Sequence, residues 1–260
     1  MKRSLCLLCL ALGACGPTMD LGRDPDIIWW SNFESGTTSD LTTPPSTMGF
    51  ADTYGGASLA IESGGHLGSL GARLRLPAAV DCCVGARLVR QDTMPMQGFY
   101  SAWLRIPANV TPPAGYWAIM KLTDVGTVGR DDLQMFDVFA VRRSGGVALS
   151  LYVHPLGGRP GLTVMPLQTV AVMADQWTHV ELFLNQATDQ TGLVRLWQDG
   201  TLLFEVKGPT SFPTAQVRRF SLTSVSENNP PLEIFVDDMA ISLRRLGPET
   251  SLRTDFSPRR

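Results

Sequence analysis

The feature that most constrains the fold of this chain is a succession of short β-type runs, separated by Gly, Pro and Asp, that dominates from Ile27 onward. No stretch carries a sustained helical period of apolar residues. Ten or more strands with turn residues between them favour an all-β fold of two packed antiparallel sheets, a β-sandwich. The clearest predicted strands are residues 58–61, 73–76, 99–106, 117–122, 147–153, 177–184, 193–198, 202–206, 219–223 and 233–242.

One pair of strands is specified by its turn. Asp199 and Gly200 separate the apolar-rich runs 193–198 and 202–206. An Asp-Gly pair accepts positive φ at both central turn positions at little cost, and it is the strongest short-range signal for a β-hairpin. The sequence therefore predicts an antiparallel hairpin here, preceded by a polar loop at 185–192.

Length and charge limit the class of protein. The chain has 260 residues, of which 44% are hydrophobic, and it shows no internal repeat and no interdomain linker. We expect one β domain at 26–246, followed by a flexible tail at 247–260. Without Lys2 and Arg3, 20 Lys and Arg stand against 24 Asp and Glu, a net charge of −4. This balance offers no basic surface for nucleic acid, and we expect a monomer.

The N-terminus reads as an export signal. Lys2 and Arg3 precede an apolar run at 5–12, which closes on Gly13, Ala14 and Cys15. A cationic start and a short apolar run ending at small residues before Cys predict a lipoprotein signal at 1–14, a lipid on Cys15 and a tether at 15–25. The alternative is an ordinary secretory signal cleaved nearby. Gly16 after the Cys resembles bacterial lipoproteins sorted to the outer membrane, so we expect an exported protein on that membrane or the cell surface.

The remaining cysteines are adjacent in sequence. Cys6 and Cys9 leave with the signal, and Cys82 and Cys83 stay in the mature chain. In an oxidising compartment this pair predicts a vicinal disulfide, with two free buried thiols as the main alternative. A metal or redox role would require C-x-x-C spacing or further ligands nearby, and neither is present.

Strand alternation sorts the side chains into two faces, because successive residues point to opposite sides of a sheet. In the strand at 147–153, for example, Leu149 and Leu151 oppose Tyr152 and the following His154. An aromatic and basic row on a concave sheet would suit sugars, since rings stack on pyranoses and cations hold carboxylates. The alternative is that these side chains lie on different sheets and face solvent. The candidate ligand-binding residues are Trp103, Trp117, His179, Glu181, Arg195 and Trp197.

A second kind of site is predicted where the two ends of the domain meet. Asp237 and Asp238 lie late in the last predicted strand, and Glu34 lies on the first. Carboxylates with backbone carbonyls are the ligands that Ca²⁺ prefers. We therefore expect a structural Ca²⁺ that holds the terminal strands together; the alternative is that Glu34 and Asp238 are solvated edge residues.

Several segments together resemble a known family. They are FESG at 33–36, YSAW at 100–103 with IP at 106–107, WAI at 117–119, QWTHVE at 176–181, DQTG at 189–192 with WQDG at 197–200, and VDDMAIS at 236–242. Across residues 27–242 the chain resembles the concanavalin A-like jelly rolls of the polysaccharide-lyase-like type, related to heparin lyase I and glucuronan lyase. The resemblance implies a two-sheet jelly roll, a groove for acidic polysaccharide, and Ca²⁺ near Glu34 and Asp237.

Lyases of this kind cleave uronate chains by β-elimination, with a group that neutralises the carboxylate, a base and an acid. The resemblance implies Lys121 or Arg105 as the neutralising group, and Tyr152 with His154 as base and acid. The Gln-Ile-His strand of alginate lyases is missing, and Lys121 stands where relatives have Gln. The sequence thus predicts an exported, lipid-anchored jelly roll that binds polysaccharide and cleaves a uronate polymer; the alternative is a noncatalytic envelope or adhesion lipoprotein that binds glycan or protein.

Overall fold

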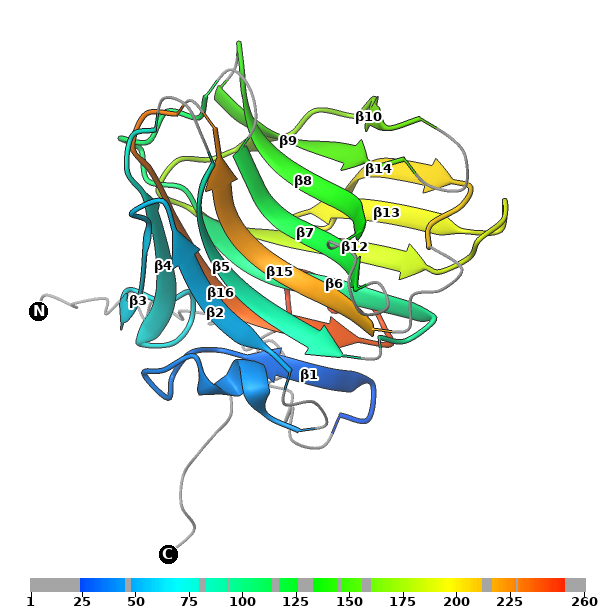
Figure 1. Ribbon diagram of the computed structural model, residues 1–260, viewed down its shortest axis with the longest axis horizontal. Coiled ribbons are helices and arrows are strands. Elements are labelled where there is room, and N and C mark those ends of the chain that lie inside the picture. Colours follow the sequence, from blue (N-terminus) through cyan, green and yellow to red (C-terminus); the bar gives the residue numbers. More distant parts are fainter. Residues whose placement is uncertain are drawn as a thin grey trace, which may run out of the picture.

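Two antiparallel sheets packed face to face make up the folded chain (Figure 1). The structure is a computed structural model that describes residues 24–44, 48–79, 83–92, 94–113, 117–125, 133–144, 146–155, 160–211, 217–227 and 229–250. The predicted all-β sandwich is confirmed. The predicted signal and most of the tether lie outside these residues. Among the described residues, no helix has the length and hydropathy that a bilayer crossing needs.

Sheet A has the strand order β14-β13-β12-β6-β16-β4-β3, and β1 also pairs with β16. Its strands are β1 (Ile27–Ser31), β3 (Ser58–Ser63), β4 (Leu70–Leu76), β6 (Gln97–Arg105), β12 (Trp177–Asn185), β13 (Leu193–Gln198), β14 (Thr201–Lys207) and β16 (Leu232–Ser242).

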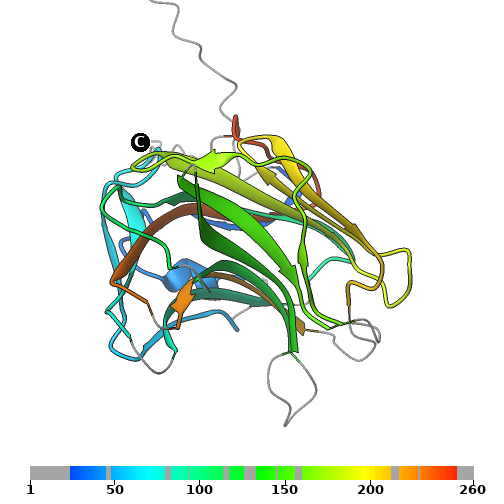
Figure 2. The same ribbon diagram turned by 90° about the horizontal axis from the view of Figure 1, so that it is seen from above.

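Sheet B has the order β10-β9-β8-β7-β15-β5-β2, and β11 also pairs with β9. Its strands are β2 (Phe50–Tyr54), β5 (Val84–Asp92), β7 (Trp117–Val125), β8 (Leu133–Arg143), β9 (Gly146–Val153), β10 (Leu162–Val164), β11 (Ala171–Val172) and β15 (Val217–Ser226). A short 3-10 helix, η1 (Ser39–Thr42), follows β1. Figure 2, seen from above, shows that the strands of both layers bend as they cross the molecule.

The core lies between the sheets and is built by strand alternation. Leu74 and Leu104 from sheet A meet Phe136, Leu151 and Phe220 from sheet B, and each of these side chains is at most 3% exposed. Burying an apolar side chain of this size stabilises the fold by roughly 1.5–3 kcal/mol. The opposite face of each sheet is therefore left to polar and aromatic side chains, and these decide what each face can bind.

Each of the ten predicted strands overlaps a strand of the structure, and the predicted hairpin is β13–β14. Asp199 and Gly200 have φ values of 46° and 81°, the positive values that the turn requires. The folded part extends beyond the predicted boundary at 246, because the Thr250 side chain is buried and its hydroxyl donates to the Leu246 carbonyl. Residues 251–260 of the predicted tail lie outside the described part of the chain.

Candidate functional site

A row of side chains crosses the outer face of sheet B, the face turned away from the core. The strand register places Val89 opposite Ser221, Ser221 opposite Lys121, Lys121 opposite Asp137, and Asp137 opposite Tyr152. Residues paired in register project to the same face, about 5 Å from one strand to the next. The row therefore joins five strands, from β5 to β9, in one continuous surface.

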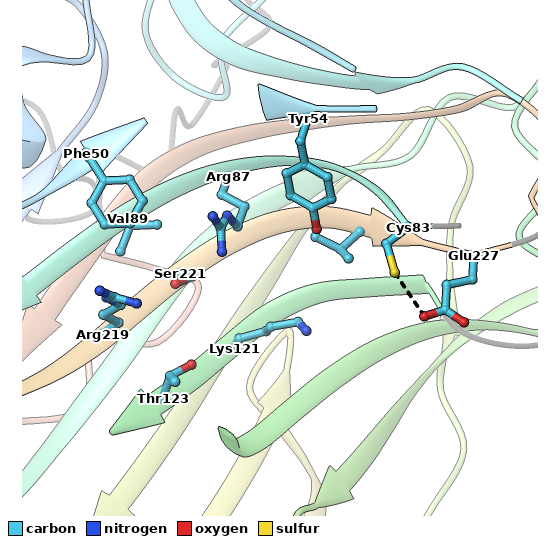
Figure 3. Close-up of a pocket in the computed structure, with 11 residues that line it drawn as sticks. Phe50, Tyr54, Cys83, Arg87, Val89, Lys121, Thr123, Arg219, Ser221 and Glu227 are labelled. Carbon is cyan, nitrogen blue, oxygen red and sulfur yellow. Dashed lines mark hydrogen bonds between the residues drawn. The ribbon is translucent and has the colours of Figure 1, made fainter. Parts of the chain in front are cut away.

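One end of this face is hollowed. The hollow has a volume of about 230 Å³ and carries three cationic and two aromatic side chains. Figure 3 shows Phe50, Arg87 and Tyr54 along one side, with Lys121 and Arg219 on neighbouring strands. We call this the sheet B hollow, and its lining is Phe50, Tyr54, Cys83, Arg87, Val89, Lys121, Thr123, Arg219, Ser221, Val225 and Glu227.

The two arginines of the hollow are held in place by their neighbours. Arg87 donates from Nε to Asp52 Oδ1 at 2.8 Å and from a terminal nitrogen to Asp52 Oδ2 at 2.5 Å. Its guanidinium lies 5.6 Å from the Tyr54 ring centroid and 5.9 Å from that of Phe50. Arg219 lies 5.5 Å from the same Phe50 ring. Forked pairing and ring contacts restrict these side chains, so the hollow presents positive charge in a defined geometry.

Beside the hollow, the predicted residues Lys121, Tyr152 and His154 lie together. Lys121 Nζ is 3.5 Å and His154 Nε2 is 3.1 Å from the same oxygen, Asp137 Oδ2. The Tyr152 ring meets the His154 ring edge-on, with centroids 4.8 Å apart. A Cβ at Gly161 would lie 2.3 Å from the Tyr152 hydroxyl, so glycine leaves room for it. The structure thus gathers a cation, a phenol and an imidazole on one patch of sheet B.

Sequence reasoning missed Asp137, the residue at the centre of this patch. Its strand, β8, was not predicted, because the run 133–141 is mostly apolar and has no clear alternation. The signal was the single acid inside that run. A carboxylate that is only 1% exposed in a strand interior needs a cationic or hydrogen-bonding partner.

The structure corrects the prediction for Arg105, the other candidate for neutralising the substrate carboxylate. It lies in β6 of sheet A, with its guanidinium 4.1 Å from the Phe235 ring centroid and 5.3 Å from that of Trp177. Tyr152 and His154 belong to the opposite layer. Arg105 therefore cannot act on the same sugar as they do.

The structure also corrects the prediction that Trp117 binds the ligand. Its side chain has no exposed surface, and its indole nitrogen donates to the Ser224 hydroxyl at 2.9 Å inside the sandwich. The register of β7 shifts between Ala118 and Met120. A bulge of this kind reverses the alternation, so Trp117 points into the core and Lys121 points out.

The other predicted ligand-binding residues lie on sheet A, and their side chains make contacts within the molecule. The His66 ring stacks on Trp103, with centroids 3.6 Å apart. Arg245 lies 4.7 Å from the Trp197 ring centroid, and Arg195 donates to a Glu205 carboxylate oxygen at 2.7 Å. The fold thus separates the predicted residues into two groups on opposite outer faces.

Two of the sheet A residues, Glu181 and His179, are buried, and Glu181 anchors the segment that follows β16. Glu181 has no exposed surface and accepts from the Leu246 backbone at 2.7 Å and from Arg245 Nε at 3.1 Å. Burial raises the pKa of Glu181, and these two donors oppose that shift. Burial, with the charges of His66 and Arg245, lowers the pKa of His179 to about 3, so its ring is neutral at pH 7. Both side chains are buried in this arrangement, so neither offers an exposed surface to a ligand.

The acidic residues predicted to hold Ca²⁺ do come together, beside the loop at 64–69 and the start of β4. Glu34 accepts from the Leu70 backbone at 2.9 Å and Asp237 from the His66 backbone at 2.7 Å, while Asp238 lies 3.0 Å from His66 Nδ1. Burial and the charges of Asp238 and Glu34 raise the pKa of Asp237 to about 8. The donor set has the oxygen chemistry of a Ca²⁺ site, but its oxygens are engaged with the loop. Among the described residues, no group of three or more His, Cys, Asp or Glu side chains is arranged to hold a metal ion.

Two of the three cysteines named for lipid or disulfide lie outside the described residues, namely Cys15 and Cys82. Cys83 is exposed, and its Sγ donates to a Glu227 carboxylate oxygen at 3.2 Å on the rim of the sheet B hollow. The alternative of two buried thiols therefore does not hold for Cys83. The vicinal disulfide stays a prediction.

Comparison with known proteins places the fold. No protein-family model matches the chain, and no curated protein sequence matches it. Among solved structures, it is similar to the endo-β-1,4-glucuronan lyase of the fungus Trichoderma reesei, with a TM-score of 0.65 and 13% identity over 86% of this chain and 100% of that one.

Two further structures are similar. A variant of the alginate lyase Aly36B, in which a lysine and a tyrosine are replaced by alanine, is in complex with an alginate tetrasaccharide; its TM-score is 0.52, at 12% identity over 85% of this chain and 96% of that one. A carbohydrate esterase of bacteriophage phi24B has a TM-score of 0.53, at 12% identity over 84% and 99%. Identities this low show the fold alone. The chain therefore has a two-sheet antiparallel jelly-roll fold of the concanavalin A-like kind.

Proposed function

We propose that this protein binds an acidic polysaccharide on the outer face of sheet B and cleaves a uronate-containing polymer by β-elimination. The observation that carries the proposal is the meeting of Lys121 and His154 at one carboxylate oxygen, with Tyr152 in contact, beside a hollow lined by cations. The similar glucuronan and alginate lyases support the same class of substrate.

The hollow supplies the binding. Phe50 and Tyr54 offer ring faces on which a pyranose can stack, and Arg87 and Arg219 offer guanidinium groups to carboxylates or hydroxyls. Hydrogen bonds to charged groups contribute about 1.5–3 kcal/mol each. A polymer with a carboxylate on each sugar therefore suits this lining better than a neutral glycan does.

The adjacent patch supplies the chemistry. Lys121 neutralises the uronate carboxylate, which makes the C5 proton more acidic. Tyr152 and His154 act as the base that removes this proton and the acid that protonates the leaving glycosidic oxygen. The electron pair of the C5–H bond forms the C4–C5 double bond as the C4–O bond breaks. The alginate lyase variant that holds a tetrasaccharide lacks a lysine and a tyrosine, the residue types of Lys121 and Tyr152.

A spectroscopic assay tests the reaction. The soluble form that starts at Asp20 is incubated with glucuronan, alginate and other uronate polymers, and the ultraviolet absorbance of new unsaturated ends is followed. We expect activity on at least one polymer, and its loss by roughly 10² to 10⁴-fold in Tyr152→Phe and His154→Ala. Turnover that survives both substitutions would contradict the proposed roles.

The second candidate function is noncatalytic binding of a glycan or protein by an envelope lipoprotein. The pairing of Arg87 with Asp52 and of Lys121 with Asp137 favours it, because each cation is already partly neutralised. Binding without new absorbance across the whole panel would select this function. It would leave the sheet B hollow as a recognition site.

Lipid anchoring through Cys15 remains part of the proposal. The charged start, the apolar run and the small residues before Cys15 support it. We expect cells that express the protein to incorporate labelled fatty acid into it, and Cys15→Ser to abolish the label. A secreted, unlabelled wild-type protein would indicate an ordinary signal.

A structural Ca²⁺ near Glu34, Asp237 and Asp238 also remains a proposal. Its support is the mutual repulsion of three carboxylates, which a divalent cation would relieve. We expect Ca²⁺ to raise the melting temperature and a chelator to reverse this effect. An unchanged melting temperature over millimolar Ca²⁺ would indicate that the loop at 64–69 and the Leu70 backbone satisfy these acids without a metal.

A further inference from the structure

Asp137 is a buried carboxylate between two of the proposed reactive groups. Its side chain is 1% exposed, whereas those of Lys121 and His154 are 12% and 21% exposed. Both partners approach Oδ2, and Oδ1 is buried without a hydrogen-bond partner among the described residues. A buried acid costs stability unless its contacts offset the loss of water. Buried polar groups with an unsatisfied atom often occur at functional sites.

The contact with Asp137 determines which nitrogen of His154 carries a proton. An ionised carboxylate can only accept hydrogen bonds, so the ring nitrogen that it contacts must donate. The contact is made by Nε2, at 3.1 Å. In the neutral ring the other nitrogen, Nδ1, then keeps its lone pair and is the one that can accept a proton.

We infer that Asp137 is a positioning residue that fixes His154 as the base, with Nδ1 as the accepting atom. The inference rests on the proposed β-elimination and assigns its two undecided roles. His154 Nδ1 takes the C5 proton, the electron pair forms the C4–C5 double bond, and the C4–O bond breaks. Tyr152 donates its hydroxyl proton to the leaving oxygen, and solvent returns the two residues to their starting states. Asp137 stabilises the imidazolium during the step and does not touch the sugar.

Asp137 also positions Lys121, the proposed neutralising group. Its ammonium group lies at the same Asp137 oxygen, 3.5 Å away, on the neighbouring strand. Asp137 therefore holds the cation that neutralises the substrate carboxylate next to the base that takes the adjacent proton. Fixing both groups to one buried atom reduces the reorganisation that the reaction needs.

The first measurement is the tautomer of His154 in the wild-type protein. Long-range proton–nitrogen NMR spectra distinguish a protonated ring nitrogen from one with a free lone pair, and a spectrum of His154→Gln identifies its signals among the three histidines. At pH values where the ring is neutral, we expect the proton on Nε2. A neutral ring protonated on Nδ1 overturns the inference, whether or not the protein is a lyase.

The second measurement is the kinetics of Asp137→Asn. An amide has nearly the same shape but can donate to Nε2, so we expect a shift toward the other tautomer and a fall in kcat of roughly 10² to 10⁴-fold, with KM changed by less than about threefold. Glu62→Gln, on the outer face of sheet A, removes the same charge and should leave kcat and KM unchanged. If Asp137→Asn keeps both its tautomer and its kcat, the inference is wrong. If the wild type cleaves no polymer, the proposed function fails, while the tautomer still decides the role of Asp137.

Discussion

The two outer faces of this sandwich carry the same kinds of residue, but the rings of one face are covered by other segments and those of the other line a hollow. Sheet A carries Trp103, Trp197 and Arg195, and sheet B carries Tyr54, Arg87 and Arg219. On sheet A, His66 from the loop at 64–69 stacks on Trp103, and Arg245 from the segment at 243–250 lies over Trp197. On sheet B, the aromatic and cationic side chains surround a hollow of about 230 Å³.

The difference teaches that an aromatic and charged strand face indicates a binding surface only where no other segment of the chain covers it. His66 stacks on Trp103, and Arg245 bridges Trp197 and Glu181. These contacts make this face a support for the loop at 64–69 and for the segment at 243–250. On sheet B the arginines contact side chains of neighbouring strands, as Arg87 contacts Asp52 and Tyr54.

The largest expected effect is a loss of activity when a cation on sheet B is removed, with no loss when a cation on sheet A is removed. Lys121→Ala should lower kcat/KM on a uronate polymer by roughly 10²-fold or more, because the substrate carboxylate is then not neutralised. Arg105→Ala, on sheet A, should leave kcat/KM unchanged. The ultraviolet assay compares the two variants. Equal losses would show that both faces take part, and the separation of the faces would be wrong.

A buried anchor gives the next largest effect, this time on stability. Glu181→Ala removes the carboxylate that holds Arg245 and the Leu246 backbone. We expect a loss of about 3 kcal/mol in the free energy of unfolding, measured in denaturant, because two donors lose their acceptor. Affinity for a uronate oligosaccharide should not change at temperatures where the variant is folded. A large loss of affinity would instead place a ligand on sheet A.

The neutral His179 predicts a pH dependence of stability. Its folded pKa of about 3 lies below the usual value of 6.5, so the unfolded chain binds the proton more readily. Its contribution to stability is present above pH 6.5 and is lost as the pH falls toward 3. Between pH 7 and pH 5 the loss should be about 2 kcal/mol. Chemical denaturation of wild type and His179→Gln tests this, and the substituted protein should lack that part of the slope.

The smallest effect concerns affinity. Arg219→Ala removes a cation from the sheet B hollow and should weaken binding of a uronate oligosaccharide about tenfold, or about 1.4 kcal/mol. Arg195→Ala removes the sheet A partner of Glu205 and is the matched control. Calorimetric titration measures both. Comparable losses in the two variants would mean that the charge of the whole protein, and not the hollow, attracts the polymer.

Much of the fold was predictable from the sequence because alternation and turn chemistry are local. The hairpin at Asp199 and the apolar face of β9 illustrate this. The sheet to which a strand belongs depends on pairing with distant strands, as when β6 pairs with β12 and β16. For that reason the sequence alone assigns Arg105 and Tyr152 to one site, whereas the structure places them on opposite sheets.

The candidate site was only partly predictable for related reasons. Lys121, Tyr152 and His154 were found from strand faces and a family resemblance, although the register that unites them is nonlocal. The bulge in β7 reversed the orientation of Trp117, and no turn residue marks it. Asp137 lies in an apolar run, and only its neighbours in space, Lys121 and His154, indicate its importance.

The most direct test of the two-face account is an NMR map of oligosaccharide binding. Backbone amide signals of the protein are followed while a uronate oligosaccharide is added to the Tyr152→Phe variant, in which we expect no turnover. The account predicts that the perturbed amides lie along β5, β15, β7, β8 and β9, on sheet B. Perturbations concentrated on β6, β12 and β13 would place the ligand on sheet A and contradict it.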